Sequence, residues 1–119
     1  MKVLILCMLL AVLSSCSKKN TIPSGIIGKD KMENILWDMI QADRFAAQYL
    51  VKDSLAIDLK KETFLLYDQV FQLNKVTKEE FVKSYNYYLS RPDITRVIFD
   101  SLATRANRRK DEVYKKYRQ

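Results

Sequence analysis

The sequence predicts an all-α protein, a small helical bundle of three to four helices that follows a signal peptide and a short tether. Residues 29–91 contain neither glycine nor proline, the two residue types that most strongly disfavour a helix interior. Apolar residues recur along this stretch at helical spacing, and residues that commonly cap helices stand where the patterns begin. No segment alternates with the period of two that is typical of a half-buried strand, and no segment repeats another.

The first helix is expected from about Asp30 to Val51. Glu33 follows Asp30 at the spacing that is typical of an N-cap with its reciprocal partner. Asp53 and Ser54 favour a break after the helix. The expected apolar face consists of Met32, Ile35, Leu36, Met39, Ala42, Ala46 and Tyr49.

A second helix is expected from about Asp58 to Leu73, and its uncertain boundary is the start. Its buried face is expected to include Phe64, Tyr67, Val70 and Phe71. Only residues 74–76 separate this helix from the next capping signal, so we expect the second and third helices to be adjacent.

The third helix has the clearest predicted start. Thr77 and Glu80 have the spacing of a capping box, and Val76 and Phe81 are placed to pack together as its hydrophobic staple. The residues expected on one face of this helix are Phe81, Tyr85, Tyr88 and Leu89.

The last helix is expected from Pro92 to about Tyr117, with proline as its first helical residue. Its apolar pattern is firm as far as Leu102 and thin over residues 105–112, so we expect the distal part to project beyond the core. The apolar residues of this helix are Ile94, Val97, Ile98, Leu102, Val113 and Tyr117.

Residues 1–15 are predicted to be a signal peptide. Lys2 precedes an unbroken apolar run of eleven residues, 3–13, which is too short for a permanent transmembrane helix of about 20 residues. The sequence Leu13-Ser14-Ser15-Cys16 resembles a bacterial lipobox. That resemblance implies cleavage before Cys16 and a diacylglyceryl group on its thiol. The lipid on Cys16 would then anchor the protein to the membrane. The alternative is an ordinary signal peptide with an incidental cysteine.

Residues 16–28 are predicted to be the lipidated cysteine and a flexible tether, and residues 29–119 the helical domain. The tether contains polar residues, Pro23, and both glycines of the chain, Gly25 and Gly28. Ile26 and Ile27 are apolar exceptions, and we expect their side chains to pack the end of the tether against the helical domain.

The composition argues against most catalytic chemistry. The chain has no histidine, and its two cysteines are Cys7, which lies in the signal peptide, and Cys16, which would be a thioether. A disulfide, a metal site and a haem or iron–sulfur cofactor are therefore not expected. With only two glycines, no phosphate-binding loop is available. We expect no cofactor and no enzymatic activity.

The positive charge is concentrated at the C-terminus. Residues 91–119 hold nine basic and four acidic side chains, a balance of +5, whereas residues 29–90 hold nine basic and ten acidic ones. Export makes nucleic acid an unsuitable partner, which leaves an anionic lipid surface or an acidic protein. The alternative is a solvated helix end whose cations complement the helix dipole. The candidate contact residues are Arg105, Arg108, Arg109 and Lys110.

Two further groups of side chains were weighed by position: Tyr87, and the pair Asp38 and Asp43. Tyr87 points away from the face shared by Phe81 and Tyr88, so it is a candidate for contact with a partner. Asp38 and Asp43 are five residues apart and do not share a tight helix face, which favours solvated surface over a paired acid–base role.

A set of residues spread from about Pro23 to Leu102 matches the pattern of a known family. They are Pro23, Ile26, Ile27, Lys31, Met32, Ile35, Leu36, Asp38, Met39, Tyr67, Val70, Phe71, Thr77, Glu80, Phe81, Ser84, Tyr87, Tyr88, Pro92, Ile98, Phe99 and Asp100. In these residues the chain resembles a group of small Bacteroidota lipoproteins, the domain of unknown function 4296. The family often has a basic residue, histidine and glycine before the capping threonine, whereas this chain has Asn74, Lys75 and Val76. Asn74 is expected to take the left-handed conformation in place of that glycine.

The resemblance implies a lipoprotein and a helical fold, and it implies no reaction. We therefore expect a membrane-anchored, non-enzymatic interaction domain that binds another envelope protein. The alternative is a structural protein that binds the lipid surface through its basic C-terminal helix. By analogy with lipoprotein sorting signals, Ser17, Lys18 and Lys19 favour the outer membrane, facing the periplasm.

Overall fold

A computed structural model describes residues 21–50 and 58–118, which form four α-helices and one π-helical turn, with no strand among them. The elements are α2 (Lys29–Phe45), the π-turn η2 (Ala46–Leu50), α3 (Leu59–Leu73), α4 (Lys78–Leu89) and α5 (Pro92–Tyr117). The predicted all-α bundle is thus confirmed. The predicted end of the first helix at Val51 and the predicted break at Asp53 and Ser54 lie outside the described residues.

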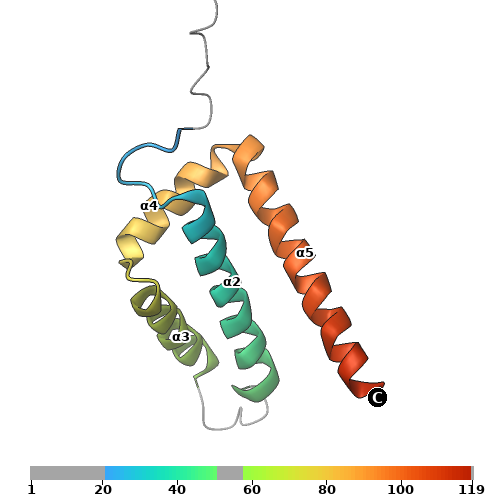
Figure 1. The fold of residues 1–119 in the computed structure, drawn as a ribbon. Helices are drawn as coiled ribbons and strands as arrows, with labels where there is room; N and C mark the ends of the chain where they lie inside the picture. Colours follow the sequence, from blue (N-terminus) through green and yellow to red (C-terminus); the bar gives the residue numbers. More distant parts are fainter. Residues whose placement is uncertain (1–20, 51–57, 119) are drawn as a thin grey trace, which may run out of the picture.

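Helix α2 is the central element of the bundle (Figure 1). α3 runs antiparallel along one side of it, and α5 runs along the other side in the same direction as α2. α4 passes obliquely over the end at which α2 and α5 begin, and residues 21–28 lie at that same end. The C-terminus of α5 lies at the opposite end of the molecule.

The hydrophobic core is formed by one face of each α-helix. Met32 and Ile35 on α2 and Ile98 on α5 are almost fully buried. On α5 the buried residues Ile94, Ile98 and Leu102 are spaced four apart, which places them on one face of a helix. No residue of α5 beyond Leu102 is fully buried, which fits the expectation that its distal part projects beyond the core.

Three predicted helix starts are confirmed, two of them by local hydrogen bonds. The Thr77 hydroxyl accepts from the Glu80 amide at 3.1 Å, and the Glu80 carboxylate accepts from the Thr77 amide at 2.7 Å, so the capping box is complete. Asp58 caps α3 by accepting from the Lys61 amide at 3.2 Å. Pro92 is the first residue of α5. The rings of Phe71 and Phe81, 5.1 Å apart, pack α3 against α4.

The predicted cap of the first helix was wrong. α2 begins at Lys29 with Gly28 as its N-cap, and no side chain caps it; Asp30 lies inside the first turn. Glu33 instead accepts a hydrogen bond from the Ser101 hydroxyl of α5 at 2.6 Å. The Glu33 carboxylate, which the sequence pattern assigned to the helix cap, therefore forms a hydrogen bond between α2 and α5 instead.

The left-handed residue of the α3–α4 turn was also predicted one position too early. Asn74 is right-handed, and Lys75 has the positive φ of 53°. The Asn74 side-chain amide donates to Asp38 at 2.9 Å and to the Val70 carbonyl at 3.0 Å. These bonds hold Asn74 against α2 and α3, so the next residue makes the turn.

The burial predicted for some apolar residues was too high. Phe64 is 52% exposed, Leu89 55% and Val97 52%, although each belongs to a predicted apolar face. Phe64 borders a hollow of about 300 Å³ at the joint of α2, α3 and α4. With only three other α-helices around α2 in the described part of the chain, some predicted core positions are not covered by a neighbouring helix.

The segment before α2 is attached to α4 by its backbone. The Ile27 amide donates to the Ser84 hydroxyl at 2.9 Å, and its carbonyl accepts from the Tyr88 hydroxyl at 2.7 Å. Ile26 and Ile27 are partly buried against the core. The expected contact of these two residues with the domain is therefore present.

Candidate functional site

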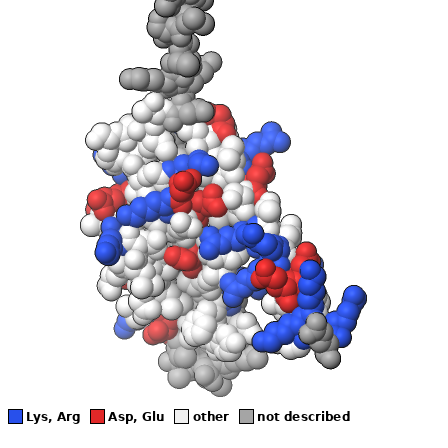
Figure 2. Space-filling view, in the orientation of Figure 1, with Lys and Arg blue, Asp and Glu red and all other residues white. Residues whose placement is uncertain are grey.

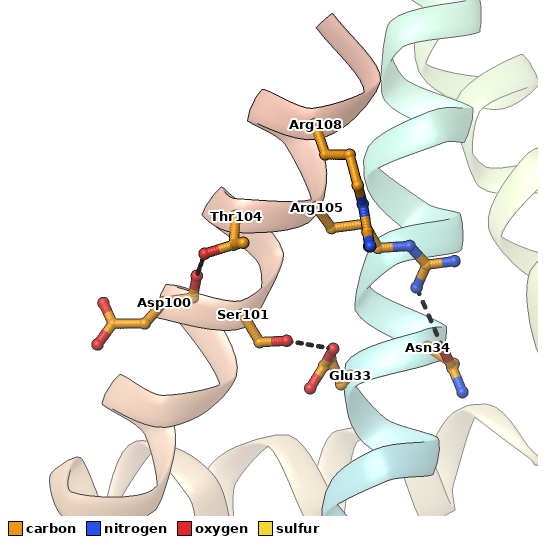
Figure 3. A pocket seen from close by; sticks show the side chains of 7 residues that line it. All are labelled: Glu33, Asn34, Asp100, Ser101, Thr104, Arg105 and Arg108. Carbon is orange, nitrogen blue, oxygen red and sulfur yellow. Dashed lines mark hydrogen bonds between the residues drawn. The ribbon is translucent and has the colours of Figure 1, made fainter. Parts of the chain in front are cut away.

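Two of the predicted contact residues, Arg105 and Arg108, lie on the face between α2 and α5 (Figure 3). The Arg105 guanidinium carbon lies 4.4 Å from the centroid of the Trp37 ring, and its Nη1 donates to the Asn34 side-chain oxygen at 3.2 Å. A shallow polar groove of about 670 Å³ lies beside this contact. Its lining residues are Glu33, Asn34, Asp100, Ser101, Thr104, Arg105 and Arg108.

Most polar groups of this groove are already used to hold the helices. The Ser101 hydroxyl donates to Glu33, and the Thr104 hydroxyl donates to the Asp100 carbonyl at 2.9 Å. Asp100 also lies 3.8 Å from Arg96 in an exposed ion pair. The groove therefore follows a hydrogen-bonded seam between α2 and α5. Its lining includes both negatively charged carboxylates and positively charged guanidinium groups.

The four candidate cations have different environments. Arg105 and Arg109 both reach across to α2, where Arg109 donates to the side-chain oxygen of Gln41. Arg108 borders the groove and, within residues 21–50 and 58–118, has no hydrogen-bond or ion-pair partner. The Lys110 ammonium lies 5.8 Å from the centroid of the exposed Tyr114 ring. Their α2 partners Asn34, Trp37 and Gln41 were not singled out from the sequence, because no local pattern links them to α5.

A second hollow, here called the distal hollow, lies further along the same face. It has a volume of about 390 Å³. The rings of Phe45 and Tyr49, 5.0 Å apart, form its aromatic wall, and the two residues are 48% and 54% exposed. The hollow is lined by Gln41, Arg44, Phe45, Gln48, Tyr49 and Arg109.

The part of α5 beyond this hollow is exposed and basic. Every described residue from 107 to 118 is exposed. Lysine and arginine side chains gather over this end in Figure 2, with acidic side chains among them. Val113 and Tyr117 lie one and two turns after Arg109 on the same helix face, and they are 47% and 84% exposed. The predicted projecting end thus carries apolar as well as basic groups.

Tyr87 lies in the joint between α4 and α5. It is half-buried against the core, its ring packs edge to face with Tyr88 at 5.4 Å, and its hydroxyl accepts from Arg91 at 3.1 Å. Arg91 also forms a two-pronged pair with Asp93, at 3.0 and 2.7 Å. This hydrogen bond holds the pKa of the Asp93 carboxyl below its usual value. The Tyr87 ring therefore already packs within the fold.

Asp38 and Asp43, for which solvated surface was expected, each accept a hydrogen bond from α3 or from the residue that caps its C-terminus. Asp38 accepts from Asn74, and Asp43 accepts from the Tyr67 hydroxyl at 2.5 Å. The bond to Asp43, together with burial and the nearby negative charge, raises the pKa of Tyr67 to about 12. Both aspartates thus link α2 to the α3 side of the bundle.

Neither a cluster of metal-ligating side chains nor a membrane-spanning helix is found among the described residues. Within the part of the chain that the structure describes, no group of three or more histidine, cysteine, aspartate or glutamate side chains is placed to hold a metal ion. None of the helices in that part combines the length and apolar character needed to cross a membrane.

Comparison with known proteins gives one match. The family model of a domain of unknown function, DUF4296, matches residues 23–112. This span begins in the segment that packs on α4 and ends within α5, before its last residues. Neither the curated proteins nor the solved structures include a significant match.

Proposed function

We propose a function from the premise that this chain belongs to the DUF4296 family of domains of unknown function. The protein is a lipid-anchored, non-enzymatic interaction module of the cell envelope, and the end of the bundle away from its anchor binds another protein. The observation that supports this proposal most is that the two ends of the bundle differ. Residues 21–28 lie at one end, and the exposed aromatic and basic groups of η2 and distal α5 lie at the other.

The anchor in this proposal is the lipid on Cys16, supported by the lipobox of residues 13–16. Thr21, the first described residue, is five positions after Cys16. Five peptide units span at most about 18 Å whatever their conformation. Because Ile27 is bonded to α4, the domain would be held close to the membrane at this end.

The distal end would then stand away from the membrane. α5 has 26 residues, which correspond to a length of about 39 Å. This is well beyond the Debye length of about 10 Å over which a charged bilayer attracts exposed cations. A surface at this position is suited to contact with a protein, and lysine and arginine there can speed encounter with an acidic one.

The alternative is a structural protein whose basic α5 binds the lipid surface. This would require the domain to lie flat, so that both ends reach the bilayer. Residues 29–50 and 58–90, which make up most of the described flank, hold eight basic and nine acidic side chains and offer no net attraction to anionic lipid. The near-neutral flank therefore favours the upright arrangement and the protein partner.

Site-specific photocrosslinking in cells tests the proposal. A photoreactive amino acid replaces Gln48 in the distal hollow or, as a matched control, Leu73 at the α3–α4 corner, which is 79% exposed. We expect a discrete protein adduct from position 48 and none from position 73. The same adduct should weaken in a Cys16→Ala background, because the module would lose its place at the membrane. Adducts of equal yield at both positions, or adducts with lipid at position 48, would contradict the proposal.

A further inference from the structure

We propose that the distal hollow, together with the apolar stripe that follows it on α5, docks an acidic amphipathic helix of a partner protein. This inference rests on the proposed function and adds the chemistry of the partner. It commits to one occupant: a helix with carboxylates on one flank and apolar side chains on its face. The observations that support it are the hydrogen-bond donors of the hollow, its aromatic wall and the charge around it.

The polar groups that line the distal hollow include two guanidinium groups and no carboxylate. Arg44 and Arg109 supply the cations, and Gln41 and Gln48 supply side-chain amides. Arg109 uses one donor on Gln41, which leaves further donors of its five for a ligand. A guanidinium group matches the geometry of a carboxylate, so a ligand with an acidic side chain suits this lining.

The orientation of the Gln41 side-chain amide is fixed by its neighbour. Because arginine can only donate, the Gln41 side-chain oxygen must face Arg109, and the amide nitrogen points the other way. That nitrogen is buried and has no hydrogen-bond partner among the described residues. It is closed to a ligand in this conformation, so the side-chain donors that the hollow offers to a carboxylate are those of Arg44, Gln48 and Arg109.

The apolar part of the surface continues from the hollow along α5. Phe45 and Tyr49 form the wall on the α2 side, and Val113 and Tyr117 extend the face of Arg109 along α5. Two neighbouring helices with apolar residues on facing sides form the kind of groove into which a third amphipathic helix packs. Exposed aromatic residues next to arginine are also typical of protein interfaces.

Charge distinguishes this occupant from a second copy of the chain. Residues 105–118 hold seven basic and two acidic side chains, a balance of +5. Two copies joined through this end would place like charges against each other, which is unfavourable. A partner helix with several carboxylates would instead be attracted to it.

Peptide binding to the mature lipidated protein, held in discs of zwitterionic lipid, tests the inference. The probes are three labelled helical peptides of about 14 residues, roughly four turns. One combines glutamate with a leucine face, one combines lysine with a leucine face, and one combines glutamate with glutamine and lacks an apolar face. Fluorescence anisotropy, with protein-free discs as the blank, gives the affinities. We expect the glutamate–leucine peptide to bind at least about tenfold more tightly than either other peptide.

Variants then locate the site. Arg44→Gln with Arg109→Gln should weaken binding of the glutamate–leucine peptide by about tenfold or more. Lys60→Gln with Lys61→Gln on α3 removes the same charge and should leave binding unchanged. Because Arg109 bonds to α2, a second pair, Val113→Asn with Tyr117→Asn at exposed positions, gives an independent test and should weaken binding as well.

The alternative outcomes are distinct. Equal affinity for the lysine–leucine peptide, equal affinity for the glutamate–glutamine peptide, or no binding at about 1 mM would overturn the inference. Displacement of the peptide by phosphatidylglycerol vesicles would assign the surface to lipid. If position 48 captures a protein in cells but the acidic peptide neither binds nor competes with it, the partner chemistry is wrong and the interaction role stands. If position 48 captures nothing, the proposed function itself fails.

Discussion

The guanidinium group of Arg105 on α5 stacks over the ring of Trp37 on α2, with 4.4 Å between its carbon and the ring centroid. Trp37 is only 6% exposed, and Arg105 also donates to Asn34. A cation–π contact of this kind stabilises by about 0.5–2 kcal/mol, more when the pair is shielded from water. The contact lies one turn beyond Leu102, where the buried face of α5 ends. It therefore joins α2 and α5 at the boundary between the core and the projecting end.

Replacement of Arg105 should loosen this junction. We expect Arg105→Met, which keeps much of the apolar stem, to lower the free energy of unfolding by about 1 kcal/mol. Urea denaturation can be followed by the fluorescence of Trp37, the single tryptophan of the chain. Arg108→Met is the matched control and should change stability by less than about 0.5 kcal/mol. Equal effects of the two substitutions would contradict a specific role for the Arg105–Trp37 contact.

The capping box of α4 should make stability depend on pH. Hydrogen bonds from the backbone and side chain of Thr77 lower the pKa of Glu80 in the folded protein. A carboxyl group whose pKa falls on folding stabilises the protein above its unfolded pKa, and this contribution is lost as pH falls through the folded value. Glu80→Gln should therefore reduce the difference in denaturation midpoint between neutral pH and acid. Glu79→Gln, an exposed neighbour outside the box, serves as the control. A parallel pH dependence for wild type and Glu80→Gln would argue against this account.

Tyr67 should be the last tyrosine to ionise. The hydrogen bond to Asp43, burial and the nearby negative charge raise its pKa to about 12. Because this folded value is above the unfolded one, its stabilising contribution is complete below about pH 10 and is lost as pH rises toward 12. Absorbance titration of tyrosinate should show a late component that disappears in Tyr67→Phe. Asp43→Asn should shift that component to lower pH, whereas a titration unchanged by both substitutions would contradict the assignment.

The features that the sequence could predict depend on residues close together in the chain. Thr77 and Glu80 are three apart, Asp58 caps the helix that follows it directly, and Pro92 begins α5. Their chemistry is local, so spacing was sufficient. The start of α2 and the turn at Lys75 instead depend on distant residues: Ile27 bonds to Ser84, and Asn74 bonds to Asp38. Spacing alone could not reveal these pairs.

In the candidate site, too, local features could be predicted from the sequence and long-range contacts could not. The basic cluster of α5 is visible in the sequence, whereas the environment of each cation is not. Arg105 is held by Trp37, and Arg109 by Gln41, across sequence separations of 68 residues. The distal hollow was missed because it combines the end of α2 with one side chain of α5.

Two side chains of α4 should control how firmly residues 21–28 are attached. Ser84 is fully buried and accepts from the Ile27 amide, while the Tyr88 hydroxyl donates to the Ile27 carbonyl. Ser84→Ala with Tyr88→Phe removes both bonds and leaves two backbone groups without partners, at a cost of about 1–3 kcal/mol for each that stays buried. We expect faster hydrogen exchange at the Ile27 amide, with exchange in distal α5 unchanged. Tyr85→Phe is the control for loss of a hydroxyl on α4, and unchanged exchange at Ile27 in the double variant would contradict the attachment.

The orientation of the anchored domain can be measured with single thiols, because the mature chain would have no free cysteine of its own. Ser24→Cys marks the end near the proposed anchor, and Lys116→Cys marks distal α5; both positions are exposed. Each mature lipidated variant is labelled with a fluorophore and placed in vesicles that contain anionic lipid and spin-labelled lipid. Since about 39 Å of α5 separates the two ends, we expect strong quenching at position 24 and little at position 116. Equal quenching that disappears in high salt would instead show that the basic helix lies on anionic lipid, the alternative in which charge attraction holds the domain flat.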